Sequence, residues 1–81
     1  MVIDVYIWLA SRLHALRRDT EIGWAALYAQ FGAGFGRLRA FRHYFIEALE
    51  LAQAAYPDAR LTIEDRGVIL HPSRPAIAKV G

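Results

Sequence analysis

Two helix-like runs joined by a glycine-rich turn constrain the fold of this chain most strongly. The runs, Trp24–Phe31 and about Arg37–Ala55, both place apolar residues at spacings of three and four, the pattern of an amphipathic helix. Between them, three glycines within residues 32–36 interrupt the pattern. The second run ends before Pro57, because proline disfavours helix in the residue that precedes it. The sequence therefore predicts two helices connected by a tight turn.

The flanking segments predict a third helix and a hairpin. Apolar spacing predicts a helix over about Val2–Leu16, and alternating apolar residues on either side of Asp65-Arg66-Gly67 predict a two-stranded hairpin. The segment Thr20–Ile22 is compatible with a short additional edge strand. This order is typical of an α+β winged helix-turn-helix, three helices followed by a two-stranded β-hairpin wing. Eighty-one residues allow one core, so we expect a single domain over residues 1–81.

The apolar positions of these elements predict one shared core. In the first helix Arg12 falls within the apolar stripe, which favours a buried or half-buried ion pair over a ligand contact. Gly32 follows the short helix and fits a left-handed C-cap. The expected inward positions are Val5, Trp8, Leu9, Leu13 and Leu16 of the first helix, Trp24, Leu27 and Phe31 of the second, Leu38, Phe41, Phe45, Leu49 and Ala52 of the third, and Leu61, Ile63, Val68 and Leu70 of the hairpin.

The positive charge is concentrated in one part of the chain. The net charge is only +2, but residues 12–42 hold six arginines against two carboxylates, which gives +4, and the remainder gives −2. Nine of the ten basic residues are arginine, the side chain best suited to bidentate contacts with phosphate and guanine. This distribution indicates a cationic face that binds nucleic acid, with an ordinary solvated charged face as the alternative.

The candidate DNA contacts lie mainly in the first half of the third helix, where basic residues precede acidic ones. That gradient is typical of helices that insert their first turns into a major groove. An arginine at the hairpin tip is predicted to meet the DNA backbone or the minor groove, and one in the loop after the first helix to meet a phosphate or to cap the helix. The candidate residues are Arg37, Arg39 and His43 on the outer face, Arg42 nearer the apolar stripe, Arg66 at the tip and Arg18 in the loop.

The first helix also has a second, weaker apolar strip opposite its core stripe. Ile3, Ile7 and Ala10 lie where an isolated domain would expose charged residues to water. We therefore expect this strip to contact another protein surface, either a missing N-terminal domain or a second copy of the chain in a homodimer.

Other functional classes lack support in the sequence. There is no cysteine, and His14, His43 and His71 lack the spacing of metal ligands, so we expect neither a metal nor any other cofactor. No carboxylate pair or nucleophile pattern indicates an enzyme, and the glycine turn lacks the lysine of a phosphate-binding loop. The longest uncharged stretch has 15 residues, too short for a membrane span, and no export signal opens the chain. The expected compartment is the cytoplasm.

Five short motifs, in order along nearly the whole chain, resemble the C-terminal region of plasmid-encoded RepA-type replication initiator proteins of bacteria. They are Asp4-x-Tyr6-x-Trp8-Leu9-Ala10-x-Arg12-Leu13-His14, Trp24-x-x-Leu27-x-x-Gln30-Phe31-Gly32, Phe41-Arg42-x-x-Phe45, Tyr56-Pro57-x-Ala59-Arg60 and Gly67-x-x-Leu70-x-Pro72-Ser73-x-Pro75. The glycine-rich turn before the third helix departs from the expected pattern.

The resemblance implies a winged-helix domain that recognises repeated sequences in double-stranded DNA of a plasmid origin. It also implies that the chain is the C-terminal part of a longer initiator. A different class of function stays open, a protein–protein or dimerisation module on a winged-helix scaffold that makes no direct DNA contact. The high apolar content, 56% of the residues, favours that alternative.

Overall fold

The computed structural model of the chain describes residues 1–75. The elements in chain order are α1 (Val2–Arg12), the 3-10 turn η1 (Leu13–Ala15), β1 (Thr20–Gly23), α2 (Trp24–Phe31), α3 (Leu38–Ala55), β2 (Arg60–Ile63) and β3 (Gly67–His71). The three helices predicted from apolar spacing are confirmed, and the last turn of the first one tightens into η1. No helix within the described residues is long and apolar enough to cross a membrane.

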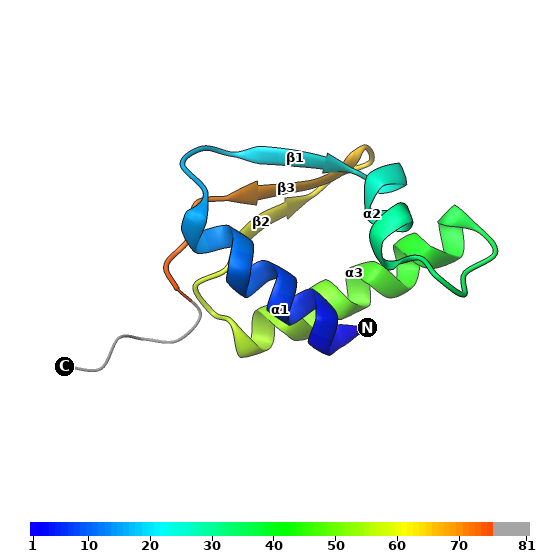
Figure 1. Cartoon of the computed structure of the whole chain (residues 1–81), viewed down its shortest axis with the longest axis horizontal. Helices are drawn as coiled ribbons and strands as arrows, with labels where there is room; N and C mark the ends of the chain where they lie inside the picture. Colours follow the sequence, from blue (N-terminus) through cyan, green and yellow to red (C-terminus); the bar gives the residue numbers. More distant parts are fainter. Residues whose placement is uncertain (76–81) are drawn as a thin grey trace.

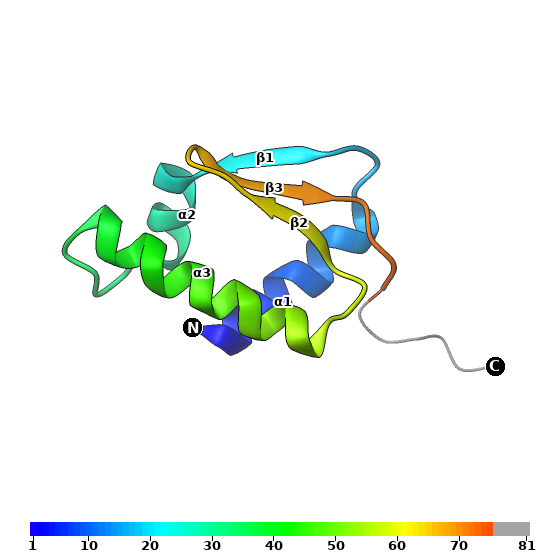
Figure 2. The ribbon, with the colours of Figure 1, turned by 180° about the vertical axis from the view of Figure 1, so that it is seen from behind.

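The elements form two layers, a helical pair and a sheet. Helices α1 and α3 pack against each other under the sheet, and α2 closes one end beside the turn between β2 and β3 (Figures 1 and 2). The sheet is antiparallel with the strand order β1-β3-β2. The prediction of a two-stranded hairpin therefore needs correction. The short segment before α2 forms the strand β1. It pairs with the edge of β3 that β2 leaves free, so the sheet has three strands.

Strand register decides which residues reach the core. Val68 and Leu70 of the central strand β3 are fully buried, and Leu61 opposite Leu70 is half-buried. Ile63, predicted to face inward, is instead 36% exposed. It is the last residue of the edge strand β2, where fewer neighbours cover a side chain.

Gly67 permits the close approach of β1 to β3. A Cβ atom at this position would lie 2.1 Å from the carbonyl oxygen of Ile22, closer than any side chain can approach a backbone atom. Its partner in the strand register is another glycine, Gly23. The glycine is thus required where the sheet meets the start of α2.

Phe45 lies at the centre of an aromatic cluster that joins the three helices. Its ring centroid is 6.3 Å from that of Trp8, 6.2 Å from Trp24, 5.4 Å from Phe31 and 5.2 Å from Phe41. Edge-on and tilted ring pairs at these distances stabilise a core beyond the area they bury. The predicted single core is confirmed at its main positions, since Trp8, Leu9, Leu27, Phe41, Phe45 and Leu49 are all buried.

Three further predicted positions differ in the structure. Leu38, assigned to the inward stripe of α3, is 43% exposed because the first turn of α3 extends past the body of the domain (Figure 1). Gly32 has φ −87° and is not left-handed; the left-handed glycine of this turn is Gly34, with φ 93°. Arg12 is exposed and has no carboxylate partner within residues 1–75. Its long side chain lies at the edge of the stripe, over the Trp8 ring at 5.9 Å, and its charged end reaches solvent.

The segment after β3 crosses back over the end of α1 and fastens to α3. The Ser73 backbone N–H donates to the Leu13 carbonyl oxygen at 3.2 Å, and the Tyr56 hydroxyl donates to the Arg74 carbonyl oxygen. Burial raises the pKa of Tyr56 above its ordinary value of 10.0, and the negative charge of Asp58 raises it further. The neutral phenol is therefore the form that the fold holds at the C-terminal end of α3.

Candidate nucleic-acid interface

The basic residues of α3 lie in its first turns, on the side turned away from α1. Arg37 is the N-cap, in extended conformation and without a side-chain cap, and both Arg37 and Arg39 are exposed. The first backbone N–H groups of this helix thus remain free of a capping side chain. Free N–H groups and the positive end of the helix dipole favour an anion near this position. The two exposed arginines add to that positive potential.

Three of the basic side chains border one hollow on the outer face of α3. Arg39, Arg42 and His43 line it together with the apolar side chains of Leu38 and Ile46, and its volume is about 460 Å³. Arg39 and His43 are four residues apart and both are exposed, as predicted for the outer face. Arg42 is half-buried, as its position nearer the apolar stripe predicts.

Trp24 connects this face of α3 to the turn between β2 and β3. Its indole N–H donates to the Glu64 carbonyl oxygen at 3.1 Å, and its backbone N–H donates to the Arg66 carbonyl oxygen at 3.2 Å. The guanidinium carbon of Arg42 lies 4.9 Å from the centroid of the same indole ring, a distance typical of a cation–π contact. One buried side chain therefore fixes the hairpin turn, the start of α2 and an arginine of α3 relative to one another.

The turn itself exposes both signs of charge. Glu64 and Gly67 close it by two backbone hydrogen bonds of 2.8 and 3.3 Å, which leaves Asp65 and Arg66 at the tip. All three charged side chains, those of Glu64, Asp65 and Arg66, are exposed. Arg66 is therefore the one basic residue of this turn, and with the two carboxylates the turn has a net charge of −1.

Two other candidates relate to this surface differently. Arg18 is exposed in the loop between η1 and β1, which lies at the opposite end of the sheet from the β2–β3 turn (Figure 1). The structure does not bring it together with the basic residues of α3. His43 does belong to the surface, and its Nε2 atom lies 3.6 Å from a carboxylate oxygen of Glu47, so protonated His43 would share its charge with that residue.

A chain of hydrogen bonds that the sequence did not indicate crosses the outer face of the sheet. His71 Nδ1 lies 2.8 Å from a carboxylate oxygen of Asp19, and His71 Nε2 lies 2.8 Å from the Thr62 hydroxyl oxygen. Carboxylate, imidazole and hydroxyl in this order resemble the relay of a nucleophilic enzyme. Here the three groups join the loop before β1 to the edge strand β2 across β3, which gives them a structural role at the end of the sheet remote from Trp24. Within residues 1–75 no three His, Asp or Glu side chains form a group that could hold a metal ion.

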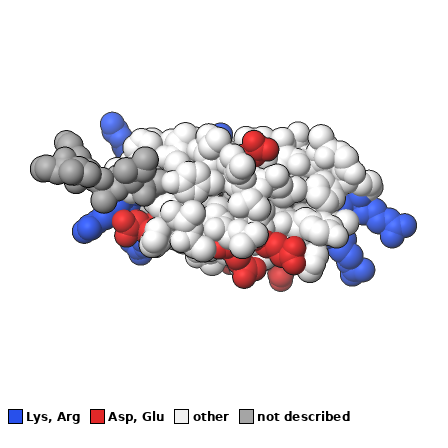
Figure 3. Space-filling model, turned by 90° about the horizontal axis from the view of Figure 1, so that it is seen from below, with Lys and Arg blue, Asp and Glu red and all other residues white. Residues whose placement is uncertain are grey.

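The predicted interface strip of α1 is exposed only in part. Ile3 and Ile7 are 74% and 58% exposed, whereas Ala10 is half-buried and packs against the core. Figure 3 shows the helical side of the molecule, where basic side chains project at the two ends and acidic side chains lie mainly along one long edge.

Sequence reasoning missed Trp24 as a member of the site and assigned it only to the core. Its partners Glu64 and Arg66 are about 40 residues away in sequence, and no local pattern signals that pairing. The exposed Leu38 and the half-buried Ile46, which border the basic hollow, were also missed, and Leu38 had matched the inward spacing of α3.

No protein-family model, no curated protein and no solved structure matches this chain. The resemblance to RepA-type initiators rests on the sequence motifs alone.

Proposed function

We propose that this chain is a winged-helix domain that binds double-stranded DNA through the outer face of α3 and the β2–β3 turn. The order helix, strand, helix, helix, strand, strand and the strand order β1-β3-β2 support the assignment of that turn as the wing. In this architecture the third helix enters the major groove and the wing meets the adjacent backbone. The motifs that resemble RepA-type initiators support recognition of repeats at a plasmid origin.

The observation that carries the proposal is the clustering of exposed arginines at the uncapped start of α3, next to the turn that Trp24 holds in place. Affinity for DNA comes largely from neutralising phosphates, and sequence is read by side chains that reach base edges. Arg37 and Arg66 are suited to phosphates at the two edges of the contact. Arg39 is exposed in the first turn of the helix, where a bidentate pair with guanine is geometrically natural.

The remaining candidates take lesser roles. His43, one turn beyond Arg39, extends the same contact surface. Arg42 stacks on Trp24 and contributes mainly by keeping the hairpin turn beside α3. Arg18 is too far along the sheet to join this surface and would meet DNA only where the duplex bends around the domain.

The test is a fluorescence-anisotropy titration of labelled origin-repeat and random duplexes at two salt concentrations. We expect salt-dependent binding that Arg39→Ala weakens by about 1–3 kcal/mol, with the loss concentrated on the specific duplex. Arg66→Ala should weaken both duplexes about equally and flatten the salt dependence. The matched control is Arg17→Ala, which removes the same charge from an exposed position outside this surface. Equal losses for Arg39→Ala and Arg17→Ala would contradict the proposed surface.

A second candidate function has its own supporting observation. The exposed isoleucines of α1 and the acidic residues of the β2–β3 turn favour a protein–protein or dimerisation module that makes no direct DNA contact. If the parent chain binds neither duplex under low-salt conditions, this module becomes the better assignment.

A further inference from the structure

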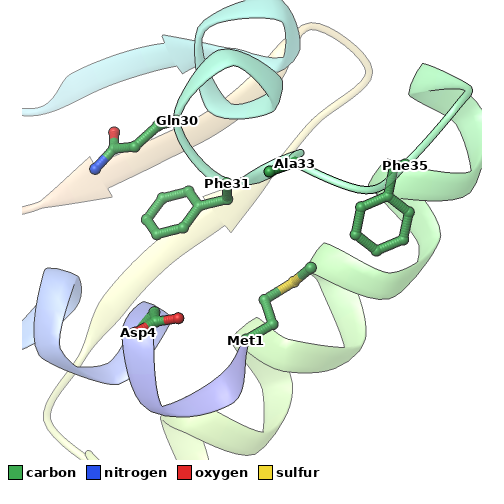
Figure 4. A pocket seen from close by; sticks show the side chains of 6 residues that line it. All are labelled: Met1, Asp4, Gln30, Phe31, Ala33 and Phe35. Atoms are coloured by element: carbon green, nitrogen blue, oxygen red, sulfur yellow. The ribbon is translucent and has the colours of Figure 1, made fainter.

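A row of open hollows, which we call the α1–α3 trough, runs along the helical side of the molecule from the end of α2 to the groove between α1 and α3. At one end Met1, Asp4, Gln30, Phe31 and Phe35 surround a hollow of about 720 Å³ (Figure 4). The hollow continues past Met1 and Phe35 toward α3, because both residues also line the next one, of about 270 Å³.

The other end of the trough is formed by apolar side chains of both helices. Val2, Ile3 and Tyr6 of α1 face Leu51 and Ala55 of α3 across a hollow of about 210 Å³. Leu51 is 59% exposed and lines three of the neighbouring hollows, which places it at the middle of the trough. An apolar channel between two helices is the kind of surface that receives the apolar face of a third helix.

The side-chain charges along the trough are of one sign, and the α-ammonium group of Met1 opposes them at one end. Asp4, Glu47 and Glu50 line its hollows, and none of the lining residues described is lysine or arginine. In Figure 3 acidic side chains lie toward the long edges of this side, and basic side chains project at its ends. The surface is thus complementary to a segment that combines apolar and cationic side chains.

The same charge pattern disfavours a second copy of this chain as the occupant. In a two-fold dimer each patch meets its own copy, so a symmetric contact centred on this trough would bring the carboxylates of one chain against those of the other. Like charges held together at an interface oppose association. The trough therefore favours a partner with opposite charge over itself.

We propose that the α1–α3 trough binds a cationic amphipathic helix of a partner protein. The apolar face of that helix lies along Ile3 and Leu51, and its lysine or arginine side chains reach Asp4, Glu47 and Glu50. The site adjoins the basic face of α3 at one point, because the Glu47 carboxylate also lies 3.6 Å from His43 Nε2.

The test uses a labelled amphipathic peptide with leucine at helical spacing and lysine elsewhere, and a matched peptide with glutamate in place of lysine. The full chain should bind the lysine peptide, and the glutamate peptide should bind at least about tenfold more weakly. Leu51→Arg should weaken the lysine peptide by about tenfold or more, because it adds a like charge in the middle of the trough. Ile63→Arg is the control, since it adds the same charge at an exposed apolar residue remote from the trough.

The outcomes separate the possible occupants. Glu50→Gln leaves the apolar surface intact and serves as a second variant in case Leu51→Arg fails to fold. It should weaken the binding of the lysine peptide and leave the binding of the glutamate peptide unchanged. Equal binding of both peptides, or of neither, would overturn the proposal. If neither binds and sedimentation shows a dimer that Leu51→Arg dissociates, the occupant is a second copy. The peptide assay contains no DNA, so a negative result there does not contradict the proposed DNA binding. A negative DNA titration likewise does not contradict the proposed peptide site.

Discussion

Replacing Trp24 by phenylalanine should destabilise the domain far more than the same replacement at Trp8. Both indoles are buried in the same core, at 4% and 6% exposure. Their N–H groups differ, because that of Trp24 donates to the Glu64 carbonyl oxygen whereas the Nε1 atom of Trp8 is buried without an acceptor among residues 1–75. The pair of variants therefore separates the hydrogen bond from the loss of ring volume.

The expected magnitudes follow from these environments. The smaller ring should cost each variant about 1–2 kcal/mol in packing and cavity terms. Trp24→Phe also loses a hydrogen bond worth about 0.5–1.5 kcal/mol and some of the cation–π contact with Arg42, for a total of about 2–3 kcal/mol. Trp8→Phe removes an unsatisfied buried donor, a gain of about 1 kcal/mol or more, so its net cost should stay below about 1 kcal/mol.

Urea denaturation followed by far-UV circular dichroism measures both free energies of unfolding. We expect Trp24→Phe to unfold at clearly lower urea than Trp8→Phe, with similar m-values because the exposed area on unfolding is nearly the same. Equal destabilisation of the two variants, or a larger loss at Trp8, would refute the assignment of Trp24 as the connection between the hairpin turn and α3.

Three further predictions concern stability. Leu49→Ala should cost about 2–5 kcal/mol in urea denaturation, because Leu49 is fully buried in the core; a loss well under 1 kcal/mol would place it elsewhere. Gly67→Ala should cost about 1–3 kcal/mol, because its Cβ would meet the Ile22 carbonyl, whereas Gly36→Ala, with open space around it, should be near neutral. The raised pKa of Tyr56 means that the unfolded chain loses this proton first, so stability should be unaffected below pH 10.0 and fall above it. Tyr56→Phe should reduce that alkaline loss relative to the parent chain, and an unchanged slope would contradict the pKa shift.

Much of the fold could be predicted because its signals are local. The glycines between residues 32 and 36 and the proline at 57 set the limits of α2 and α3 to within one residue. Apolar spacing found the core positions of both helices. It failed at Leu38, which has the right spacing but lies in a turn of helix with nothing packed over it.

The candidate site was predictable only as a set of arginines. Helical geometry placed Arg39 and His43 on the outer face and Arg42 nearer the core, as the structure has them. The partners that organise the site could not be predicted, because the contacts of Trp24 with the β2–β3 turn depend on the pairing of strands distant in sequence. The same holds for the hydrogen bonds of His71 with Asp19 and Thr62.

The most direct test of the proposed function is to map the DNA contact on the protein by NMR. The backbone amide and arginine side-chain signals of the ¹⁵N-labelled chain are followed during titration with a duplex. The proposal predicts that the perturbed signals gather at residues 37–43 and 64–67, with Arg39 among the largest. Perturbations gathered instead on the α1–α3 side, around Ile3 and Leu51, or no perturbation at low salt, would contradict DNA binding through the outer face of α3.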